Sequence, residues 1–459
     1  MESMGVRKFF KKYKWDCFAV LLILLSFPLF FYKLGQSSLV SFDEAWYAGI
    51  AKNILIKGNP FTLEWNGTAF TDHPPLGFWL MAISFAAFGI NEFSARFVQA
   101  SLGLSTLIIV YFLGKELFNK TIGFISGIAL ASSPWFLFRA RSGNLDAILT
   151  FFFILSLYLS VSSSRNKKYL TPLGLSLVFL FLTKSLIPFI ILVPIWIIFW
   201  GKVKLTDLKQ PLVLFLLPVV VWFSYQIISK PYFLTHYLKI GAPGIGLRPS
   251  FFDNISLMKT YLHNGIGKWF WPGIFAILLG FFTFQKRFLF LSVFFISFFT
   301  PFLFSPKGQI WHLIPLHPIL ILSFFGFSSV FLNAILKKKI LVALIIVIVG
   351  AYVSYFQARR NWYEFIDIPS YISDEAILSK EAANYSENFY IDDLFGPAAA
   401  FYSGKNVHVL DRGQIKPLFE SDQKLILITR KWRLNEEGIP EEAYEIIKTD
   451  RDKMLIRKR

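Results

Sequence analysis

Long apolar runs recur through the first 356 residues and constrain the fold of this chain more than any other feature. The first run is DCFAVLLILLSFPLFFY, which starts at Asp16. A helix needs about 20 such residues to cross the ~30 Å hydrocarbon core of a bilayer. Only 17% of the residues are charged, whereas soluble domains usually carry about 25%. The sequence therefore predicts an all-α polytopic membrane protein.

The spacing of the apolar runs and of the basic loops predicts the number of crossings. The first run lacks a small-residue cleavage site, so we expect it to stay in the protein as a helix. The later runs lie near 76–90, 97–113, 121–138, 145–161, 169–182, 186–200, 211–228, 269–284, 288–304, 311–331 and 339–356. If every run crossed, four basic loops would lie outside, although Lys and Arg favour the cytoplasmic side. All four become cytoplasmic if the 76–90 run is interfacial or re-entrant. We therefore predict about 11–13 transmembrane helices, with interfacial helices in the first outer loop.

The net charge of +18 has its origin in this topology. Residues 1–356 hold 31 Lys and Arg against 11 Asp and Glu, whereas residues 357–459 hold 16 against 18. The excess of bases therefore lies in membrane loops, which argues against a nucleic-acid partner. The single cysteine, Cys17, excludes an intrachain disulfide and a cysteine-based metal cluster.

The last hundred residues differ from the rest of the chain. Polar stretches alternate with the short strand-like runs FYIDDLFG, NVHVLD, KLILITR and DKMLIRK. We therefore predict two domains, a transmembrane domain at 1–356 and a small α/β domain at 357–459. By the same charge arithmetic, the N-terminus is cytoplasmic and the C-terminal domain is extracytoplasmic.

Acidic residues are few in the membrane part, and most of them lie on one predicted face. Four share the first outer loop and one starts a helix at the same face: Asp43, Glu44, Glu64, Asp72 and Asp146. Ionisable groups in or beside a membrane domain usually serve a pathway or a site. The alternative is that they are solvated loop charges or helix caps.

Cations also lie at the predicted outer face. Lys184 stands between two apolar runs, Lys307 and His312 flank a short turn, and His73 and His236 lie in outer segments. A cation at this leaflet edge suits a lipid phosphate. For the two lysines, snorkelling to the lipid headgroups is the alternative.

Several motifs in this order resemble those of the protein O-mannosyltransferase and lipid A aminoarabinose transferase superfamily, which has the GT-C fold. They are SFDEAWYAGIAKNILIKGNP, DHPPLGFWLMAISFAAFGINEFSARF, RARSGNLDAILTFF, FLTKS and HLIPLHP. The resemblance covers roughly residues 35–335. It implies a multispan enzyme that acts at the non-cytoplasmic face on sugars carried by polyprenyl phosphate, with inversion at the anomeric carbon.

The resemblance also implies roles for individual residues. Asp43 matches the carboxylate that orients and deprotonates the acceptor hydroxyl, and Glu44 and Asp146 complete the catalytic group. Asp146 is expected to hold Arg139 or Arg141, or to shape the pocket. The candidates for stabilising the donor phosphate are His73, Lys184, Lys307 and His312. The supporting residues are Asp72, Arg96 and Arg141.

Two positions depart from the family pattern, and one pair suggests a metal. His73 stands where many relatives carry lysine, which makes phosphate binding sensitive to pH near neutrality. His312 stands where relatives often carry tyrosine. Some relatives hold a metal near the Pro-Pro motif, and Asp72 and His236 are the matching pair for a divalent ion here. Two protein ligands are fewer than a usual zinc site has.

The expected function is therefore sugar transfer from a polyprenyl-phosphate donor to a lipid, glycan or protein acceptor, in a bacterial inner membrane. A transporter or flippase of lipid-linked glycans is the alternative. Such a protein usually places polar residues at the bilayer midplane and shows repeated halves, and neither feature is evident in the sequence. A receptor-like scaffold leaves the group of Asp43, Asp72 and His73 without a purpose.

Overall fold

The computed structural model describes residues 16–241, 251–304, 310–392 and 396–459. Contacts group the chain into two compact units, each made of segments that are distant in sequence. One, called here the helical unit, comprises Met1–Lys33, Thr71–Gly77 and Gln99–Ile368. The other, called the mixed unit, comprises Leu34–Phe70, Phe78–Val98 and Pro369–Arg459. The predicted domains, 1–356 and 357–459, are continuous in sequence, whereas these units are not. The predicted boundary therefore stays a prediction.

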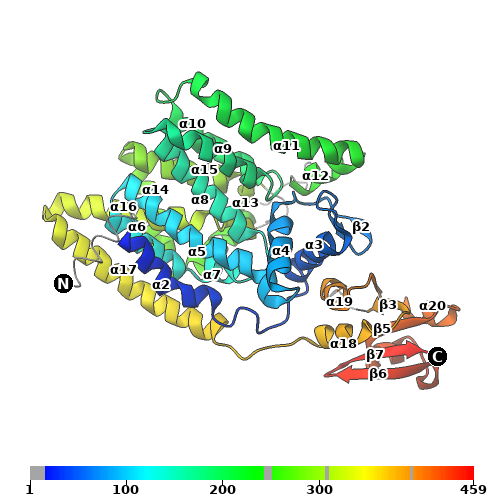
Figure 1. Ribbon diagram of the computed structural model, residues 1–459. Helices are drawn as coiled ribbons and strands as arrows, with labels where there is room; N and C mark the ends of the chain where they lie inside the picture. Colours follow the sequence, from blue (N-terminus) through cyan, green and yellow to red (C-terminus); the bar gives the residue numbers. More distant parts are fainter. Residues whose placement is uncertain (1–15, 242–250, 305–309, 393–395) are drawn as a thin grey trace, which may run out of the picture. The chain divides into compact units, whose positions relative to one another are not determined.

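The helical unit consists almost wholly of helices joined by short turns (Figure 1). Its longer helices are α2 (Cys17–Phe31), α5 (Glu92–Leu117, from Gln99 onward), α6 (Lys120–Ala131), α7 (Pro134–Ala140), α8 (Asp146–Ser163), α9 (Leu170–Phe181), α10 (Leu192–Phe199), α11 (Lys209–Ser229), α12 (Phe233–Gly241), α13 (Phe251–Ile266), α14 (Phe270–Phe282), α15 (Lys286–Leu303), α16 (Leu316–Leu336) and α17 (Lys339–Asn361). Short 3-10 or π turns extend them: η1 (Lys167–Tyr169), η2 (Ile187–Ile191), η3 (Leu205–Leu208), η4 (Gly267–Trp269), η5 (Ile310–Leu313) and η6 (Trp362–Ile366). The expected helical class is confirmed.

Among the described residues, seven helical segments are long and apolar enough to cross a membrane. The number is eight if α6 and α7, bent by 72°, form one broken span. Pro134 starts α7 at the bend, where its missing N–H costs nothing. Three further apolar helices are shorter, at Cys17–Phe31, Leu76–Phe88 and Ile187–Phe199. The predicted runs therefore all form helices, but several are short or broken, so fewer qualify as spans than the eleven to thirteen predicted.

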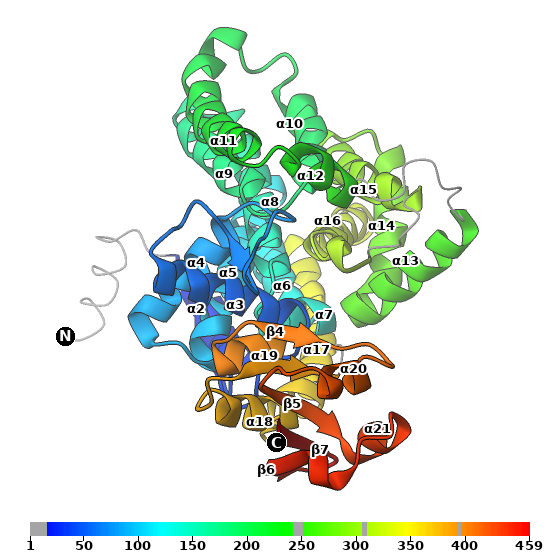
Figure 2. The ribbon, with the colours of Figure 1, turned by 90° about the vertical axis from the view of Figure 1, so that its right-hand side faces the viewer.

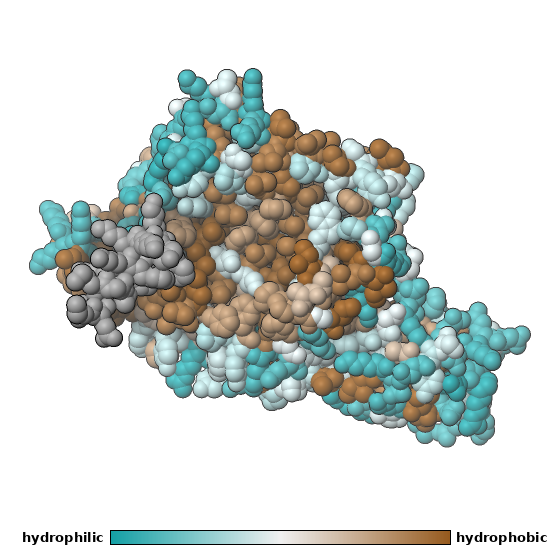
Figure 3. Space-filling model, viewed as in Figure 1, coloured by the Kyte–Doolittle hydropathy of each residue, from teal (hydrophilic) through white to brown (hydrophobic). Residues whose placement is uncertain are grey.

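Apolar side chains cover the outside of these helices as well as the inside. Phe, Leu, Ile and Val side chains are exposed along α11, α14 and α17, and Figure 3 shows broad hydrophobic areas on the viewed face. Exposed apolar surface of this extent is not stable in water. The chain is an integral membrane protein.

The mixed unit joins the first outer loop to the C-terminal segment. The loop forms α3 (Asp43–Lys57), the hairpin β1 (Glu64–Trp65) and β2 (Thr68–Ala69), and α4 (Leu76–Phe88). With 13 residues, α4 is about 20 Å long, too short to cross the ~30 Å hydrocarbon layer. This agrees with the expectation that the 76–90 run is interfacial.

The C-terminal segment folds into a five-stranded sheet with strand order β4-β3-β5-β7-β6 (Figure 2). Its strands are β3 (Asn388–Ile391), β4 (Val407–Val409), β5 (Leu425–Arg430), β6 (Tyr444–Asp450) and β7 (Lys453–Lys458). Its helices are α18 (Asp374–Ala382), α19 (Gly396–Ser403), α20 (Ile415–Glu420) and α21 (Lys431–Glu436). β3 is parallel to β4 and β5, whereas β7 is antiparallel to β5 and β6. The four predicted strands are confirmed, and β6 was missed.

Hydrogen bonds tie the loop to this sheet domain within the mixed unit. Asn66, at the tip of the β1–β2 hairpin, exchanges two side-chain hydrogen bonds with the backbone of Val407, at 2.6 and 2.7 Å. Asn66 and Gly67 both have positive φ, as a two-residue hairpin turn requires. Helix α19 packs against α3. The outer loop is thus held by the C-terminal domain.

Candidate functional site

A buried carboxylate bound by two cations lies at the start of α8 in the helical unit. Lys184 Nζ donates to Asp146 Oδ1 at 2.8 Å, and Arg139 Nε donates to Asp146 Oδ2 at 2.6 Å. The side chains of Asp146 and Lys184 are only 1% and 4% exposed. Ions this deeply buried persist only when they are paired and hydrogen-bonded. The prediction left Arg139 and Arg141 open as partners of Asp146, and the structure shows Arg139.

Local structure brings these residues together. The Asn144 side chain accepts from the backbone N–H of Asp146 at 2.9 Å and so closes the turn before α8. Arg139 belongs to the last turn of α7, and Lys184 lies in the turn after α9. The backbone N–H of Leu76 donates to the carbonyl of Leu182 at 2.9 Å. This bond attaches the segment that carries His73 beside the Lys184 turn.

Two histidines complete the group, the buried His312 and the partly buried His73. Burial lowers the pKa of His73 to about 3, with the positive charge of Lys184 acting in the same direction and Asp146 opposing it. Burial, Lys184 and the neighbouring His73 likewise hold the pKa of His312 well below its ordinary value. Both imidazoles are therefore neutral at neutral pH. The expectation that His73 titrates near neutrality does not hold for the protein without a bound anion, because burial outweighs the charge of Asp146.

These shifts predict how stability depends on pH. In the unfolded chain both histidines take up protons near pH 6.5, whereas in the folded protein they do not until the pH is far lower. The unfolded state then binds more protons, so the free energy of unfolding falls as the pH drops below about 6.5. We expect the melting temperature of the detergent-solubilised protein to fall between pH 7 and pH 5. His73→Gln should reduce this slope, and an unchanged slope would contradict the assignment.

The predicted metal pair is in direct contact. His236 Nε2 and Asp72 Oδ1 lie 2.7 Å apart, and both side chains are partly exposed. Their types suit a divalent ion such as zinc, which binds imidazole nitrogen and carboxylate oxygen. Within the described ranges, however, no group of three or more His, Cys, Asp or Glu residues is placed to hold a metal. A metal held by this pair would need water or substrate oxygens for its remaining positions.

In the mixed unit, Glu44 and Arg96 form a buried two-point ion pair. Arg96 Nε and Nη2 donate to the two carboxylate oxygens at 2.7 and 2.9 Å. Arg96 also donates to the carbonyls of Leu34, Ser37 and Ser38. Both oxygens of Glu44 are thus engaged in fixing the segment before α3. This geometry suits a positioning role for Glu44 better than direct participation in chemistry.

Asp43 is placed differently from its neighbour. It is the first residue of α3 and is half-buried, whereas Glu44 is buried. Successive residues project about 100° apart around a helix, so the two carboxylates face different surroundings. Asp43 is therefore the more accessible of the two carboxylates.

The remaining predicted residues have separate positions. Arg141 donates to the carbonyls of Leu29 and Tyr32 at 2.9 and 2.8 Å, which ties it to the end of α2 rather than to Asp146. Lys307 lies outside the described residues. The structure thus gathers Asp72, His73, Asp146, Lys184, His236 and His312 in the helical unit, and Asp43, Glu44 and Arg96 in the mixed unit. Arg139, which the sequence offered only as one of two possible partners of Asp146, is a further member of this group.

Sequence comparison finds similar proteins for part of the chain. The family model for dolichyl-phosphate-mannose-protein mannosyltransferase matches residues 72–228. The undecaprenyl phosphate-alpha-4-amino-4-deoxy-L-arabinose arabinosyl transferase 2 of Pseudomonas fluorescens is 32% identical over 181 residues, which are 37% of this chain and 32% of that protein. The putative mannosyltransferase YkcB of Bacillus subtilis is 26% identical over 262 residues, 56% of this chain and 36% of that protein. The matches thus span about a third of the length of these relatives.

The fold resembles solved structures over more of the chain than the sequence matches cover. ArnT from Cupriavidus metallidurans, crystallised with undecaprenyl phosphate, has a TM-score of 0.72 at 16% identity and covers 95% of this chain and 97% of its own. The oligosaccharyltransferase of Archaeoglobus fulgidus, solved with Zn and sulfate, has a TM-score of 0.58 at 13% identity, covering 89% and 67%. The chain thus shares the fold of ArnT over nearly all of its length, and its segment from Asp72 to Ile228 matches the mannosyltransferase family model.

Proposed function

We propose that the protein is an inverting glycosyltransferase that moves a sugar from a polyprenyl-phosphate donor to a lipid, glycan or protein acceptor at the non-cytoplasmic face. The observation that carries this proposal is the buried ion pair of Lys184 and Asp146 with His73 and His312 beside it. It places one paired cation and two neutral imidazoles together in a membrane protein. The resemblance to aminoarabinosyl transferases and to ArnT bound to undecaprenyl phosphate supports a lipid phosphate as the ligand.

The proposed donor site works through electrostatics. Asp146 holds the ammonium of Lys184 in one position, and the second cation, Arg139, balances the carboxylate. When the bond between the anomeric carbon and the phosphate oxygen breaks, its electron pair stays on the lipid phosphate. A positioned ammonium and imidazole N–H donors stabilise that developing charge more in the transition state than in the bound donor. His73 and His312 can each donate one such N–H in their neutral form.

Asp43 is proposed as the general base. Its carboxylate takes the proton of the acceptor hydroxyl as the acceptor oxygen attacks the anomeric carbon from the face opposite the phosphate. One displacement of this kind inverts the configuration and releases polyprenyl phosphate. A positioned base contributes about 10²–10⁴-fold to such a step. Asp72 and His236 are proposed to hold a divalent ion, when one is bound, which would neutralise charge near the donor.

The proposed placement is the inner membrane, with a cytoplasmic N-terminus and an extracytoplasmic C-terminal domain. The excess of bases in one set of loops supports it.

The decisive experiment uses the purified full-length protein. Incubation with a panel of polyprenyl-phosphate sugars and cell-envelope lipid extract should release free polyprenyl phosphate and yield a glycosylated acceptor, both measured by mass spectrometry. A transporter or flippase would leave the donor chemically unchanged while moving it between leaflets of proteoliposomes. Leaflet exchange without release of polyprenyl phosphate would overturn the proposal.

A further inference from the structure

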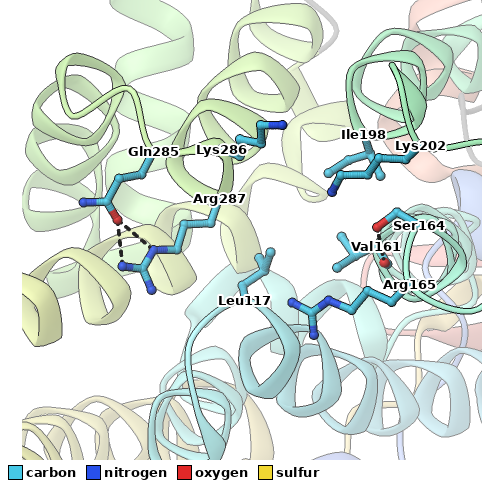
Figure 4. Close-up of a pocket in the computed structure, with 9 residues that line it drawn as sticks. All are labelled: Leu117, Val161, Ser164, Arg165, Ile198, Lys202, Gln285, Lys286 and Arg287. Atoms are coloured by element: carbon cyan, nitrogen blue, oxygen red, sulfur yellow. Dashed lines mark hydrogen bonds between the residues drawn. The ribbon is translucent and has the colours of Figure 1, made fainter.

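A second group of cations surrounds a cavity at the other end of the helical unit. The cavity has a volume of about 310 Å³, near the lower limit of about 300–1,000 Å³ for small-molecule sites. Its lining contains four basic residues, two uncharged polar residues and three apolar ones (Figure 4): Arg165, Lys202, Lys286, Arg287, Ser164, Gln285, Leu117, Val161 and Ile198. No acidic residue belongs to the lining.

This cavity is far from the Asp146 group. Asp146 is the first residue of α8 and Arg165 follows its last residue, Ser163. An α-helix of 18 residues is about 27 Å long, close to the thickness of the hydrocarbon core. The two sites therefore lie at opposite ends of a membrane-length helix. The cavity belongs to the other leaflet and is no part of the proposed donor site.

The lining cations come from three loops that are distant in sequence. They follow α8, follow α10 and precede α15, and these are three of the four basic loops that the charge pattern placed on the cytoplasmic side. Figure 4 shows the charged ends of Arg165 and Lys202 turned toward the shared space. Arg165 is paired with Glu116, whereas the charges of the other three cations repel each other in the absence of an anion. A convergence of this kind favours a negative ligand.

Two of the cations are held in place and two are available. Arg165 is bound by the carboxylate and backbone carbonyl of Glu116, and Arg287 donates to Gln285 Oε1 at 2.7 and 3.0 Å. Lys202 and Lys286 make no ion pair with any residue in the described ranges and are exposed. The pocket thus has two guanidinium groups held by hydrogen bonds and two exposed ammonium groups that form no ion pair within the described ranges. Lysine ammonium is a compact point charge that binds phosphate without demanding one geometry.

We propose that this cavity binds the phosphate group of an anionic lipid in the leaflet opposite the Asp146 group. The apolar side chains of Leu117, Val161 and Ile198 line the same hollow, so it offers both a cationic rim and apolar contact. That combination fits a lipid headgroup at the boundary between water and hydrocarbon. The proposal is independent of sugar transfer, because it assigns no role to the donor or the acceptor.

The test measures lipid binding by the purified full-length chain in detergent, without any sugar donor. Native mass spectrometry would count bound phosphatidylglycerol and phosphatidylcholine in titrations of each lipid. We expect a preference for phosphatidylglycerol, and at least a tenfold loss of its affinity in the double variant Lys202→Gln/Lys286→Gln. The matched control, Lys168→Gln/Lys204→Gln, removes the same charge from the loops after α8 and α10 without touching the cavity lining, and should change affinity less than twofold.

The comparison of the two double variants and a competition experiment test the proposal further. Equal losses in both double variants, or no preference between the two lipids, would show only the general attraction of a basic surface and would overturn the proposal. Competition by inorganic phosphate distinguishes the sources of the anion. Displacement of phosphatidylglycerol by inorganic phosphate identifies the phosphate alone as sufficient, whereas its failure shows that the lipid body contributes. Either result supports a phosphate site.

Discussion

Asp43→Asn is expected to reduce sugar transfer by about 10²–10⁴-fold while the protein folds and binds polyprenyl phosphate as before. The amide has nearly the shape of the carboxylate but cannot take the acceptor proton. Asp43 is half-buried and starts α3, where asparagine is well tolerated. The measurement is the rate of polyprenyl phosphate release at saturating donor, together with the melting temperature and the donor Kd.

Two neighbouring acids serve as controls for this result. Glu64 lies in the same outer loop and pairs with Lys57, so Glu64→Gln should retain activity. Glu44 is locked to Arg96, so Glu44→Gln should lose activity only together with folded protein, through a lower melting temperature. If Asp43→Asn transfers sugar at the normal rate, Asp43 is not the base. If it lowers the melting temperature as Glu44→Gln does, its role is structural.

The Asp146 group should respond asymmetrically to loss of its carboxylate or of its lysine. Asp146→Asn removes the carboxylate charge that both the buried Lys184 and the partly buried Arg139 donate to. Breaking a buried ion pair from one side costs about 3–5 kcal/mol. We therefore expect a large fall in melting temperature and little folded protein. Lys184→Gln leaves Asp146 bound to Arg139, so its loss of stability should be smaller.

The same pair of variants separates folding from donor binding. Lys184→Gln should weaken the binding of polyprenyl phosphate by at least about tenfold, the effect of losing one charged contact of ~1.5–3 kcal/mol. Binding is measured by isothermal titration on the folded fraction, and stability by a melting curve of the same sample. Normal donor affinity in Lys184→Gln would show that the lysine only neutralises Asp146. Arg141→Gln is the matched control. It removes one positive charge from a residue that donates to the end of α2, so donor affinity should be retained.

The sequence predicts those features that depend on local pattern. The apolar runs locate the helices, and the strand-like runs locate β3, β4, β5 and β7. β6 was not predicted because its sequence, YEIIKTD, contains charged residues near both ends. It is a strand because it pairs with β7. The boundaries of spans were less predictable, because α13, η4 and α14 continue as one segment of 32 residues, although only its second half is strongly apolar.

Site residues were predictable by type but not by partner. The position of Asp146 at a helix start and of Lys184 between apolar runs pointed to a site, yet nothing local shows that they bind each other across 38 residues. The sequence offers both Arg139 and Arg141 as partners of Asp146, and only the structure shows that the first donates to Asp146 and the second to the end of α2. The low pKa of His73 also depends on tertiary burial.

The bond between Asn66 and Val407 joins positions 341 residues apart, and Ser41 similarly accepts from the backbone N–H of Ala398 at 3.0 Å. The C-terminal domain and the predicted first outer loop are therefore expected to evolve together, and they should be exchanged together in engineered variants. A chimera that takes its C-terminal domain from one relative and its first loop from another would mismatch these contacts, whereas exchanging both segments together would keep them. Substitution of Asn66 or Ser41 would then call for matched changes around Val407 or Ala398.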